Sequence, residues 1–424
     1  MILIKDGRVI DPESGMDETI DLLIDGGRIA GIGKFPRSDE YTRILDGKGK
    51  VVAPGLVDVH VHFRDPGLIY KEDLVTGARA AAAGGYTTVV CMANTKPVID
   101  GIDVFQELKA REERLPVHVL QTAAVTKGLK GQELTDMEAL FQAGAAGFTD
   151  DGIPISDPVL LMEAFRRAKA LGVPVSLHEE DPALIGSSGI NQGAVSRALG
   201  VAGAPALAEE VLIARDGLLA LHTGARVNIQ HVSSRVSVDL IRMYKGLGAD
   251  LYAEVTPQHF SLTEQAALEQ GALAKVNPPL RTEEDRYGLI EGLKDGTIDC
   301  IATDHAPHSR EEKSQELGTA PSGMIGLETA LALGITKLVR TGQLTLPQLL
   351  TKMTVNPAKL YGLDCGHIKV GAAADLVLFD ERKKWTVRGE DFHSKSANSP
   401  FIGMELYGKV SCTICNGQVV YECS

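Results

Sequence analysis

Between residues 50 and 308 the chain repeats one pattern eight times, a β-rich run that ends in polar residues and then an amphipathic segment. The intervening segments show helical periodicity and end at glycines, as in DLVTGARAAAAGG, PVLLMEAFRRAKALG and VSVDLIRMYKGLG. Eight such alternations predict an α/β fold of the parallel (β/α)8 barrel type. A doubly wound open sheet is the alternative, but no glycine fingerprint follows the first run. The β-rich runs are KVVAPGLVDVHVHF, GYTTVVCMAN, LPVHVLQTAAV, GAAGFTDD, GVPVSLHEE, ARVNIQHVS, ADLYAEVTP and GTIDCIATDHAPH.

The two ends of the chain differ from this middle part. The first fifty residues read as short strands with a turn at Asp25-Gly26-Gly27. Strand-like runs return after Tyr361, and Asn416-Gly417 between two of them is a strong hairpin signal. We expect residues 1–50 together with 361–424 to form one small β domain, and residues 51–360 to form the barrel domain.

Composition excludes several classes of protein. The formal net charge is −13 and no run is rich in lysine or arginine, so neither nucleic acid nor a membrane is an expected partner. The N-terminus lacks the apolar core of a signal peptide, no apolar run is long enough to span a bilayer, and six cysteines give no disulfide framework. A cytoplasmic location follows as the expectation. Cys412 and Cys415 form a CxxC, but residues three apart on a strand face opposite ways, so ordinary strand cysteines are expected.

Polar side chains gather where the predicted strands end. In a parallel barrel the carboxyl ends of all strands meet at one rim, and chemistry is found there. Six of the eight runs end in imidazole, carboxylate or amide groups. These residues are His60 and His62, Asn94, Asp150 and Asp151, His178, His231, and Asp304 with His305, of which His305 faces away from Asp304 and reads as structural.

His60 and His62 lie two apart on a strand, so both side chains point to the same face. Their Cα atoms are about 7 Å apart, which lets both imidazoles reach one ion. Alone, the pair is weak evidence, since hydrogen-bonded core histidines give the same pattern. Four histidines and two carboxylates at one rim predict a metal centre, and they exceed the needs of one tetrahedral zinc. Two divalent ions, with Zn²⁺ the expected metal, fit this set better.

Arg64 follows the two histidines at the same rim. A guanidinium cannot be a metal ligand, so it is expected to hold an anionic group of the substrate, in bidentate fashion if that group is a carboxylate. The alternative is a structural salt bridge in the barrel mouth.

Taken together, the motifs resemble one known family. The segments GLVDVHVHFRDPG, CMANTKP, GFTDDG, SLHEED, IQHVS, VNPPLR and IATDHAPH are similar to those of dihydroorotases of the amidohydrolase superfamily. Many relatives bridge two metals with a carboxylated lysine at the end of strand four, whereas this chain offers aspartate there, as in one class of the family. The resemblance implies a set of ligands: His60, His62 and Asp304 for one ion, His178 and His231 for the second, and Asp151 as the bridge.

The resemblance also implies substrate-binding residues. Arg64, Asn94 and His308 would hold a substrate carboxylate, and Asn277 with the backbone from Pro321 to Gly323 would hold the ring amide. Loop capping is the alternative for the two asparagines. The polar stretch around His308 could be a mobile lid or a solvated loop. Gln258 stands where the family pattern favours a histidine, which affects no expected ligand.

The activity implied is the reversible cyclisation of N-carbamoyl-L-aspartate to L-dihydroorotate and water, a step of pyrimidine synthesis. A hydroxide bridging two metals would be the nucleophile and Asp304 the general acid and base. The alternatives are a dihydropyrimidinase, hydantoinase or allantoinase, or a non-catalytic structural partner of aspartate transcarbamoylase. The expected partner is the small-molecule substrate, and the resemblance leaves a homo-oligomer and a transcarbamoylase complex open.

Overall fold

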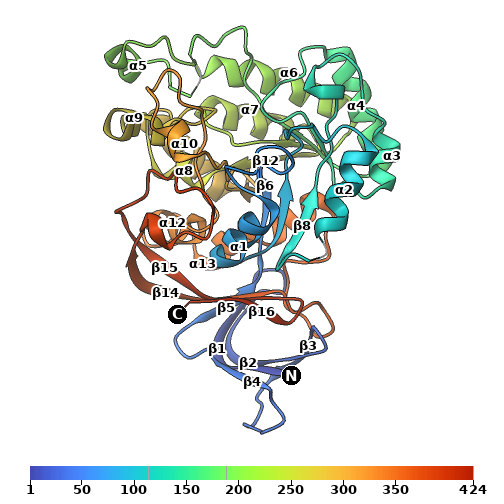
Figure 1. The fold of residues 1–424 in the computed structure, drawn as a ribbon, viewed down its shortest axis with the longest axis vertical. Coiled ribbons are helices and arrows are strands. Elements are labelled where there is room, and N and C mark those ends of the chain that lie inside the picture. The colour runs from blue at the N-terminus through green and yellow to red at the C-terminus, as the bar shows by residue number, and fades with distance from the viewer. Residues whose placement is uncertain (113, 188, 424) are drawn as a thin grey trace.

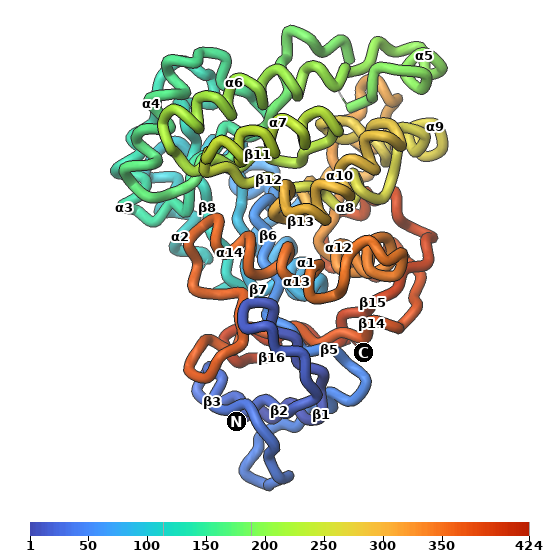
Figure 2. Tube along the Cα trace, turned by 180° about the vertical axis from the view of Figure 1, so that it is seen from behind, coloured from blue at the N-terminus to red at the C-terminus, as the bar shows by residue number. Residues whose placement is uncertain are grey.

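The computed structural model describes residues 1–112, 114–187 and 189–423. A barrel surrounded by helices forms one part of the molecule, and a mixed β-sheet that contains both chain termini lies against one end of it (Figure 1). The view from behind shows the same two parts, with the helices on the barrel side of the sheet (Figure 2). No helix within the described residues is both long and apolar enough to cross a membrane.

The barrel is closed by parallel strands, which confirms the predicted (β/α)8 fold. Strands β6, β7 and β8 form one parallel sheet, and β9 to β13 form a second. Two parallel bridges join these sheets at both edges, Val61 to His305 and Ala123 to Phe148. The strands are β6 Leu56–Val61, β7 Tyr86–Cys91, β8 His118–Gln121, β9 Phe148–Thr149, β10 Val175–Leu177, β11 Val227–Ile229, β12 Leu251–Val255 and β13 Cys300–Ile301.

Helices follow the strands where the periodicity predicts them. Asp73 caps the amino end of α1 with its side chain, and Gly85 ends it with a φ of 91°, a conformation that glycine adopts without steric cost. Ser234 caps α7 in the same way. The helices are α1 Leu74–Gly84, α2 Ile102–Glu112, α3 Met137–Gln142, α4 Pro158–Leu171, α5 Ala194–Leu199, α6 Leu207–Thr223, α7 Arg235–Gly246, α8 Pro257–Ser261, α9 Gln265–Gln270, α10 Glu283–Asp295, α11 Arg310–Lys313, α12 Ala330–Gly334, α13 Leu346–Met353 and α14 Val355–Tyr361.

The mixed sheet combines both ends of the chain in the order β16-β15-β14-β5-β1-β2-β3, with β4 beside β1. The two predicted turns are present, one between β2 and β3 and the other between β15 and β16. The domain boundaries themselves stay a prediction. The strands are β1 Ile2–Asp11, β2 Met16–Asp25, β3 Arg28–Gly33, β4 Arg43–Asp46, β5 Val51–Pro54, β14 Leu376–Thr386, β15 Glu405–Cys415 and β16 Gln418–Glu422.

The first β-rich run of the sequence is divided between the two parts. Its beginning is β5, which pairs with β1 and β14, and its end is the barrel strand β6. Gly55 lies at the division, and a Cβ there would lie 2.1 Å from the Thr87 hydroxyl oxygen. Only glycine at position 55 therefore allows the chain to pass this close to Thr87 of β7.

Strand β14 packs against two separate cores, because successive side chains on a strand face opposite ways. Leu376 and Leu378 belong to the core inside the mixed sheet. Val377 and Phe379 belong to the large core that fills the space between barrel and helices. Strand β14 thus packs the mixed sheet against the barrel.

Phe379→Ala is expected to lower the free energy of unfolding by about 3–5 kcal/mol, because it removes a large, fully buried side chain and leaves a cavity. Urea denaturation of the parent and the variant measures the change. Val370→Ala is the control, since Val370 is 58% exposed and should cost less than about 0.5 kcal/mol. A loss below about 1 kcal/mol for Phe379→Ala would contradict the packing described here.

Candidate active site

The rim at the carboxyl ends of the barrel strands encloses a small cavity of about 130 Å³. Most of the residues singled out from the sequence line it, although they follow seven different barrel strands. His60 lies directly behind His62 and Asp151 and is fully buried. The predicted residues that line the cavity are His62, Arg64, Asn94, Asp151, His178, His231, Asn277, Asp304 and Gly323.

Asp151 is shared by two groups of potential metal ligands. One group is His60, His62 and Asp151, and the other is Asp151, His178 and His231, each with its donor atoms within 4.8 Å of one another. The Asp151 oxygens lie 3.5 Å from Nε2 of both His60 and His62. Burial alone would raise the pKa of Asp151, but the charges of the neighbouring histidines lower it well below its usual range. This geometry can hold two ions bridged by one carboxylate.

The first pair of histidines is oriented by partners on the far side of each ring. Nδ1 of His60 lies 2.5 Å from a carboxylate oxygen of Glu254, which leaves Nε2 facing Asp151. Nδ1 of His62 lies 3.0 Å from the Asn94 side-chain oxygen, which leaves its Nε2 facing Asp304 at 2.9 Å. Such partners fix the ring tautomer and make the free nitrogen a better ligand.

In the second pair of histidines, His178 is oriented in the same way. Nε2 of His178 lies 3.1 Å from a carboxylate oxygen of Glu180, so Nδ1 faces Nε2 of His231 at 2.9 Å. Two nitrogens that bind one tetrahedral zinc would be about 3.3 Å apart, close to this spacing. Glu180 and its neighbour Glu179 are both buried.

Glu254 contacts the candidate site and was not singled out from the sequence. Its second oxygen accepts a hydrogen bond from the Asn228 side chain, and its first lies 3.3 Å from the backbone nitrogen of His231. It therefore links the strands that carry His60 and His231. A signal was present in the run ADLYAEVTP, where a carboxylate interrupts an otherwise apolar strand. Such a charge is rarely buried without a partner.

Asp304 follows β13, and hydrogen bonds to the preceding residue, Thr303, hold its backbone in place. Asp58, whose pKa is raised to about 7 by burial, accepts hydrogen bonds from the backbone nitrogen of Thr303 at 3.1 and 3.2 Å. The Gln258 side chain donates to the Thr303 carbonyl at 3.1 Å. Asp304 itself has a φ of 47°, and its Oδ1 lies 2.9 Å from His62. His305 is structural, as expected, since its Nδ1 accepts from a backbone amide.

Backbone strain concentrates at this rim. Six non-glycine residues among those described have a positive φ, and three of them line the cavity: Arg64, His231 and Asp304. Each such conformation costs on the order of 1–3 kcal/mol, and it persists only where the surrounding structure imposes it. The strain therefore accompanies the aiming of these three side chains into one small volume.

The Arg64 guanidinium has no carboxylate partner within 4 Å among the described residues. Its one hydrogen bond to protein is donated to the Pro307 carbonyl at 3.3 Å. Burial lowers the pKa of Arg64, while the negative charges of Asp304 and Asp151 raise it, so the side chain stays a cation. Among the described residues, Arg64 therefore does not form the structural salt bridge that was the alternative from the sequence. Its guanidinium lines the cavity as a cation with free donors.

Asn277 and Gly323 also line the cavity, from the segments that follow β12 and β13. The Asn277 side-chain oxygen is buried and has no hydrogen-bond partner among the described residues. A buried acceptor without a partner is costly, so it is expected to bind a ligand or water. Gly323 has a φ of 130°, and a Cβ there would lie 2.9 Å from Ala306. The backbone can therefore approach the cavity only at a glycine.

His308 and Pro321 are not among the residues that line this cavity. Nε2 of His308 donates a hydrogen bond to the Ser322 carbonyl at 2.8 Å. Burial and the charges of Arg64 and Lys71 lower the pKa of His308 to about 3, so the ring is neutral. The Pro321 carbonyl accepts from the Lys313 ammonium at 2.9 Å. Both residues thus hold the loop that carries Ser322 and Gly323. His308 also lines a neighbouring groove of about 610 Å³.

Two buried lysines that the sequence reading did not single out fasten the same loop. The Lys313 ammonium donates to the Gly323 carbonyl at 2.9 Å, and the Lys275 ammonium donates to the carbonyls of Leu317 and Ala320, both at 2.8 Å. Burial lowers the pKa of Lys313 to about 7, with a further contribution from the charge of Lys275. The loop is therefore tied down at both ends beside the cavity.

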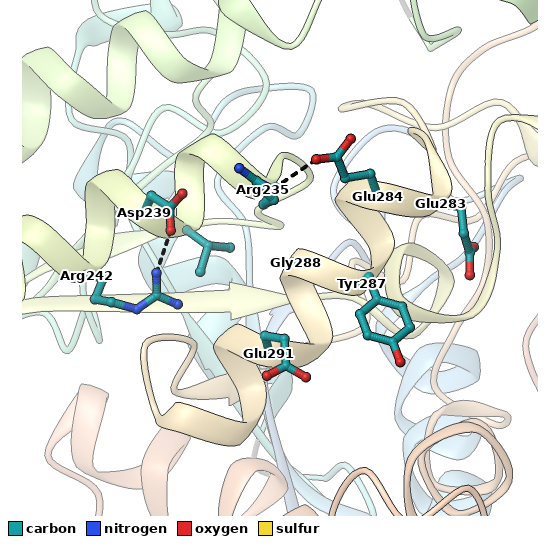
Figure 3. A pocket seen from close by; sticks show the side chains of 9 residues that line it. Arg235, Asp239, Arg242, Glu283, Glu284, Tyr287, Gly288 and Glu291 are labelled. Carbon is teal, nitrogen blue, oxygen red and sulfur yellow. Dashed lines mark hydrogen bonds and ion pairs between the residues drawn. The ribbon is translucent and has the colours of Figure 1, made fainter.

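A larger groove lies elsewhere, between α7 and α10, with a volume of about 680 Å³ (Figure 3). Both of its arginines are paired with carboxylates of the groove, Arg235 with Glu284 at 2.9 Å and Arg242 with Asp239 at 2.5 Å. Chemistry needs unpaired or perturbed groups that converge, and these belong to the small cavity instead.

Glu254→Gln is expected to weaken metal binding at His60 by about 10- to 100-fold, because the ring loses the carboxylate that orients it. Competition for metal ions against a chromophoric chelator measures the affinity. Glu284→Gln, on a side chain that is 75% exposed, is the control. Unchanged affinity in Glu254→Gln would show that the His60–Glu254 contact does not support metal binding.

Comparison with known proteins identifies the family of this chain. The family described as dihydro-orotase-like matches residues 49–237, and the amidohydrolase family matches residues 294–421. Dihydroorotases of Clostridioides difficile and Lactococcus lactis are 59% and 52% identical, over 100% and 99% of both chains. The solved L-hydantoinase of Arthrobacter aurescens is 30% identical, with a TM-score of 0.89 over 99% of this chain and 96% of that one. The chain therefore belongs to the dihydroorotase family of the metal-dependent amidohydrolases.

Proposed function

We propose that this protein catalyses the reversible cyclisation of N-carbamoyl-L-aspartate to L-dihydroorotate and water in pyrimidine biosynthesis. The observation that carries the proposal is the Arg64 guanidinium, which faces the cavity beside the potential metal ligands and has no ion-pair partner among the described residues. Both forms of this substrate carry a carboxylate that stays unchanged in the reaction. A dihydropyrimidinase or hydantoinase substrate that lacks a carboxylate would leave this cation uncompensated.

We assign the metal ligands as two sets that share Asp151. His60, His62 and Asp304 form one set and His178 with His231 the other, which fits two divalent ions, with Zn²⁺ as the expected metal. The donor chemistry agrees, since neutral imidazole and carboxylate are typical zinc ligands. When bound, such ions supply a hydroxide near neutral pH and polarise the amide carbonyl of the substrate.

The side chains of the protein then divide the remaining work. Asp304 accepts the proton of the attacking nucleophile and passes it to the leaving ring nitrogen, and it reverses both transfers during ring closure. Its position supports this role, because it touches His62 and also lines the cavity. Arg64 pairs with the substrate carboxylate, and the free Asn277 oxygen accepts a hydrogen bond from a ring N–H.

Asn94 and His308 have narrower roles in this proposal than the sequence suggested. The Asn94 amide nitrogen donates to Asp151 at 2.9 Å and its oxygen faces His62, so its polar atoms are already engaged by the potential ligands. We assign it to their orientation, at the edge of the carboxylate site. His308 holds Ser322 and reaches the substrate only through that loop, whose motion as a lid stays a prediction.

A cytoplasmic location stays a prediction, which the reduced cysteines favour. A homo-oligomer and a complex with a transcarbamoylase also stay predictions.

Substrate preference tests the function directly. Dihydrouracil has the same ring amide as dihydroorotate but lacks the carboxylate, so it forfeits hydrogen bonds to a charged group worth about 1.5–3 kcal/mol. We expect kcat/KM to favour dihydroorotate by at least about 10- to 150-fold. Arg64→Met should remove most of this preference by lowering activity on dihydroorotate alone.

Arg310→Met, a change at an exposed arginine outside the cavity, is the matched control and should keep the preference. Equal kcat/KM for both substrates in the parent would favour the dihydropyrimidinase alternative. A preference retained in Arg64→Met would place the carboxylate site elsewhere.

Asp304→Asn separates proton transfer from metal binding. The amide keeps the shape and one oxygen but cannot act as a base, so kcat is expected to fall by at least about 100-fold. Elemental analysis should find at least two metal equivalents in the parent and a smaller proportional loss in the variant than in kcat. Asp364→Asn, with a side chain that is 99% exposed, is the control. Near-normal turnover in Asp304→Asn would assign the proton transfer to another group.

A further inference from the structure

The mixed sheet meets the end of the barrel opposite to the cavity (Figure 1). A second cluster of potential metal ligands lies on or beside strands at this junction. His118 begins β8, Asp375 directly precedes β14, and Cys415 is the last residue of β15. The Cys415 sulfur also approaches the carbonyl of Thr87, at the amino end of β7, at 3.8 Å. Because the catalytic cavity is at the carboxyl ends of the same strands, this cluster is not part of it.

The donor set and spacing fit a divalent cation. His118, Asp375 and Cys415 offer one nitrogen, one oxygen and one sulfur, all within 4.8 Å of one another. Nε2 of His118 lies 3.0 Å from Oδ2 of Asp375, and two such ligands of a tetrahedral zinc would be about 3.3 Å apart. A thiolate and a carboxylate would balance the charge of a divalent ion, so the partly buried site would carry no net charge.

The ligands are held in place by the surrounding backbone. Oδ1 of Asp375 accepts a hydrogen bond from the backbone nitrogen of Asn416 at 2.7 Å, and its carbonyl accepts one from Gly55 at 2.8 Å. These bonds leave Oδ2 directed toward His118, as outer partners do at known metal sites. The His118 side chain is 36% exposed, which gives an ion a path from solvent to the buried sulfur of Cys415.

The buried thiol of Cys415 is not a reactive redox group. Burial and the negative charge of Asp375 raise the pKa of Cys415, whereas the backbone amides of His118 and Asn416 lower it. Without a cation the sulfur therefore stays protonated, and an ion would displace that proton. Cys412, its partner in the CxxC, packs into the core inside the mixed sheet, so the two cysteines do not act as a pair.

We propose that His118, Asp375 and Cys415 form a structural binding site for a borderline divalent cation such as Zn²⁺, separate from the catalytic centre. Zinc suits this mixture of imidazole, carboxylate and thiolate. A bound ion would join β8 of the barrel to the segments that enter β14 and leave β15, and so would fasten the C-terminal strands to the barrel. The site does not depend on the proposed catalytic reaction.

Cobalt substitution tests this site without interference from the catalytic centre. A thiolate ligand gives bound Co²⁺ an intense near-ultraviolet charge-transfer band that imidazole and carboxylate ligands do not give. No cysteine is among the residues that line the catalytic cavity, so Co²⁺ bound there produces no such band. The full-length protein is freed of metal with a chelator and titrated with Co²⁺, while absorbance and bound metal are measured together.

The parent and Cys412→Ser should develop the band, and Cys415→Ser should lose it and bind one equivalent of Co²⁺ fewer. His118→Gln changes a partly exposed side chain, so it should fold, and it should weaken Co²⁺ binding at this site by at least about 10-fold. Zn²⁺ should raise the Tm of the parent more than that of Cys415→Ser, since binding to the folded state alone stabilises it. Absence of the band in the parent, or its persistence in Cys415→Ser, would overturn the proposal.

Discussion

The active site depends on one buried carboxylate, that of Asp151, which lies among four imidazoles at the rim of the barrel. An ionised aspartate in this position would be strongly destabilised by burial unless positive charge surrounded it. Histidines on both sides lower its pKa, and they form with it the two groups that can each hold an ion. The position at the end of β9 is the one that connects both groups.

The remaining polar network serves to aim the side chains around that carboxylate. Glu254, Asn94 and Glu180 each contact one histidine ring, at the nitrogen on the far side from the potential metal position. Strained backbone at Arg64, His231 and Asp304 accompanies this arrangement. Because several strands contribute, the geometry is fixed only when the barrel is closed, and the large core around β14 and the helices supports that closure.

Fold and function separate clearly in this protein. Hydantoinases share the barrel and the mixed sheet, at a TM-score of 0.89 for the Arthrobacter aurescens structure, so the architecture alone does not select a substrate. The side chains that line the small cavity differ from those of the groove between α7 and α10. In the groove, both arginines are paired with carboxylates (Figure 3). An unpaired guanidinium and an unpaired amide oxygen, both facing one cavity, define the chemistry of the ligand more closely than the fold does.

The sequence by itself determined the barrel and the residues at its rim. Alternating strand and helix patterns are local properties, and polar residues at the ends of apolar runs are visible without a structure. Only the tertiary structure decided which groups meet. It showed that Glu254 supports His60 and that His308 holds a loop instead of lining the cavity. It also brought Cys415 to His118 and Asp375, across more than 250 residues, because pairing between distant strands depends on packing that no local pattern records.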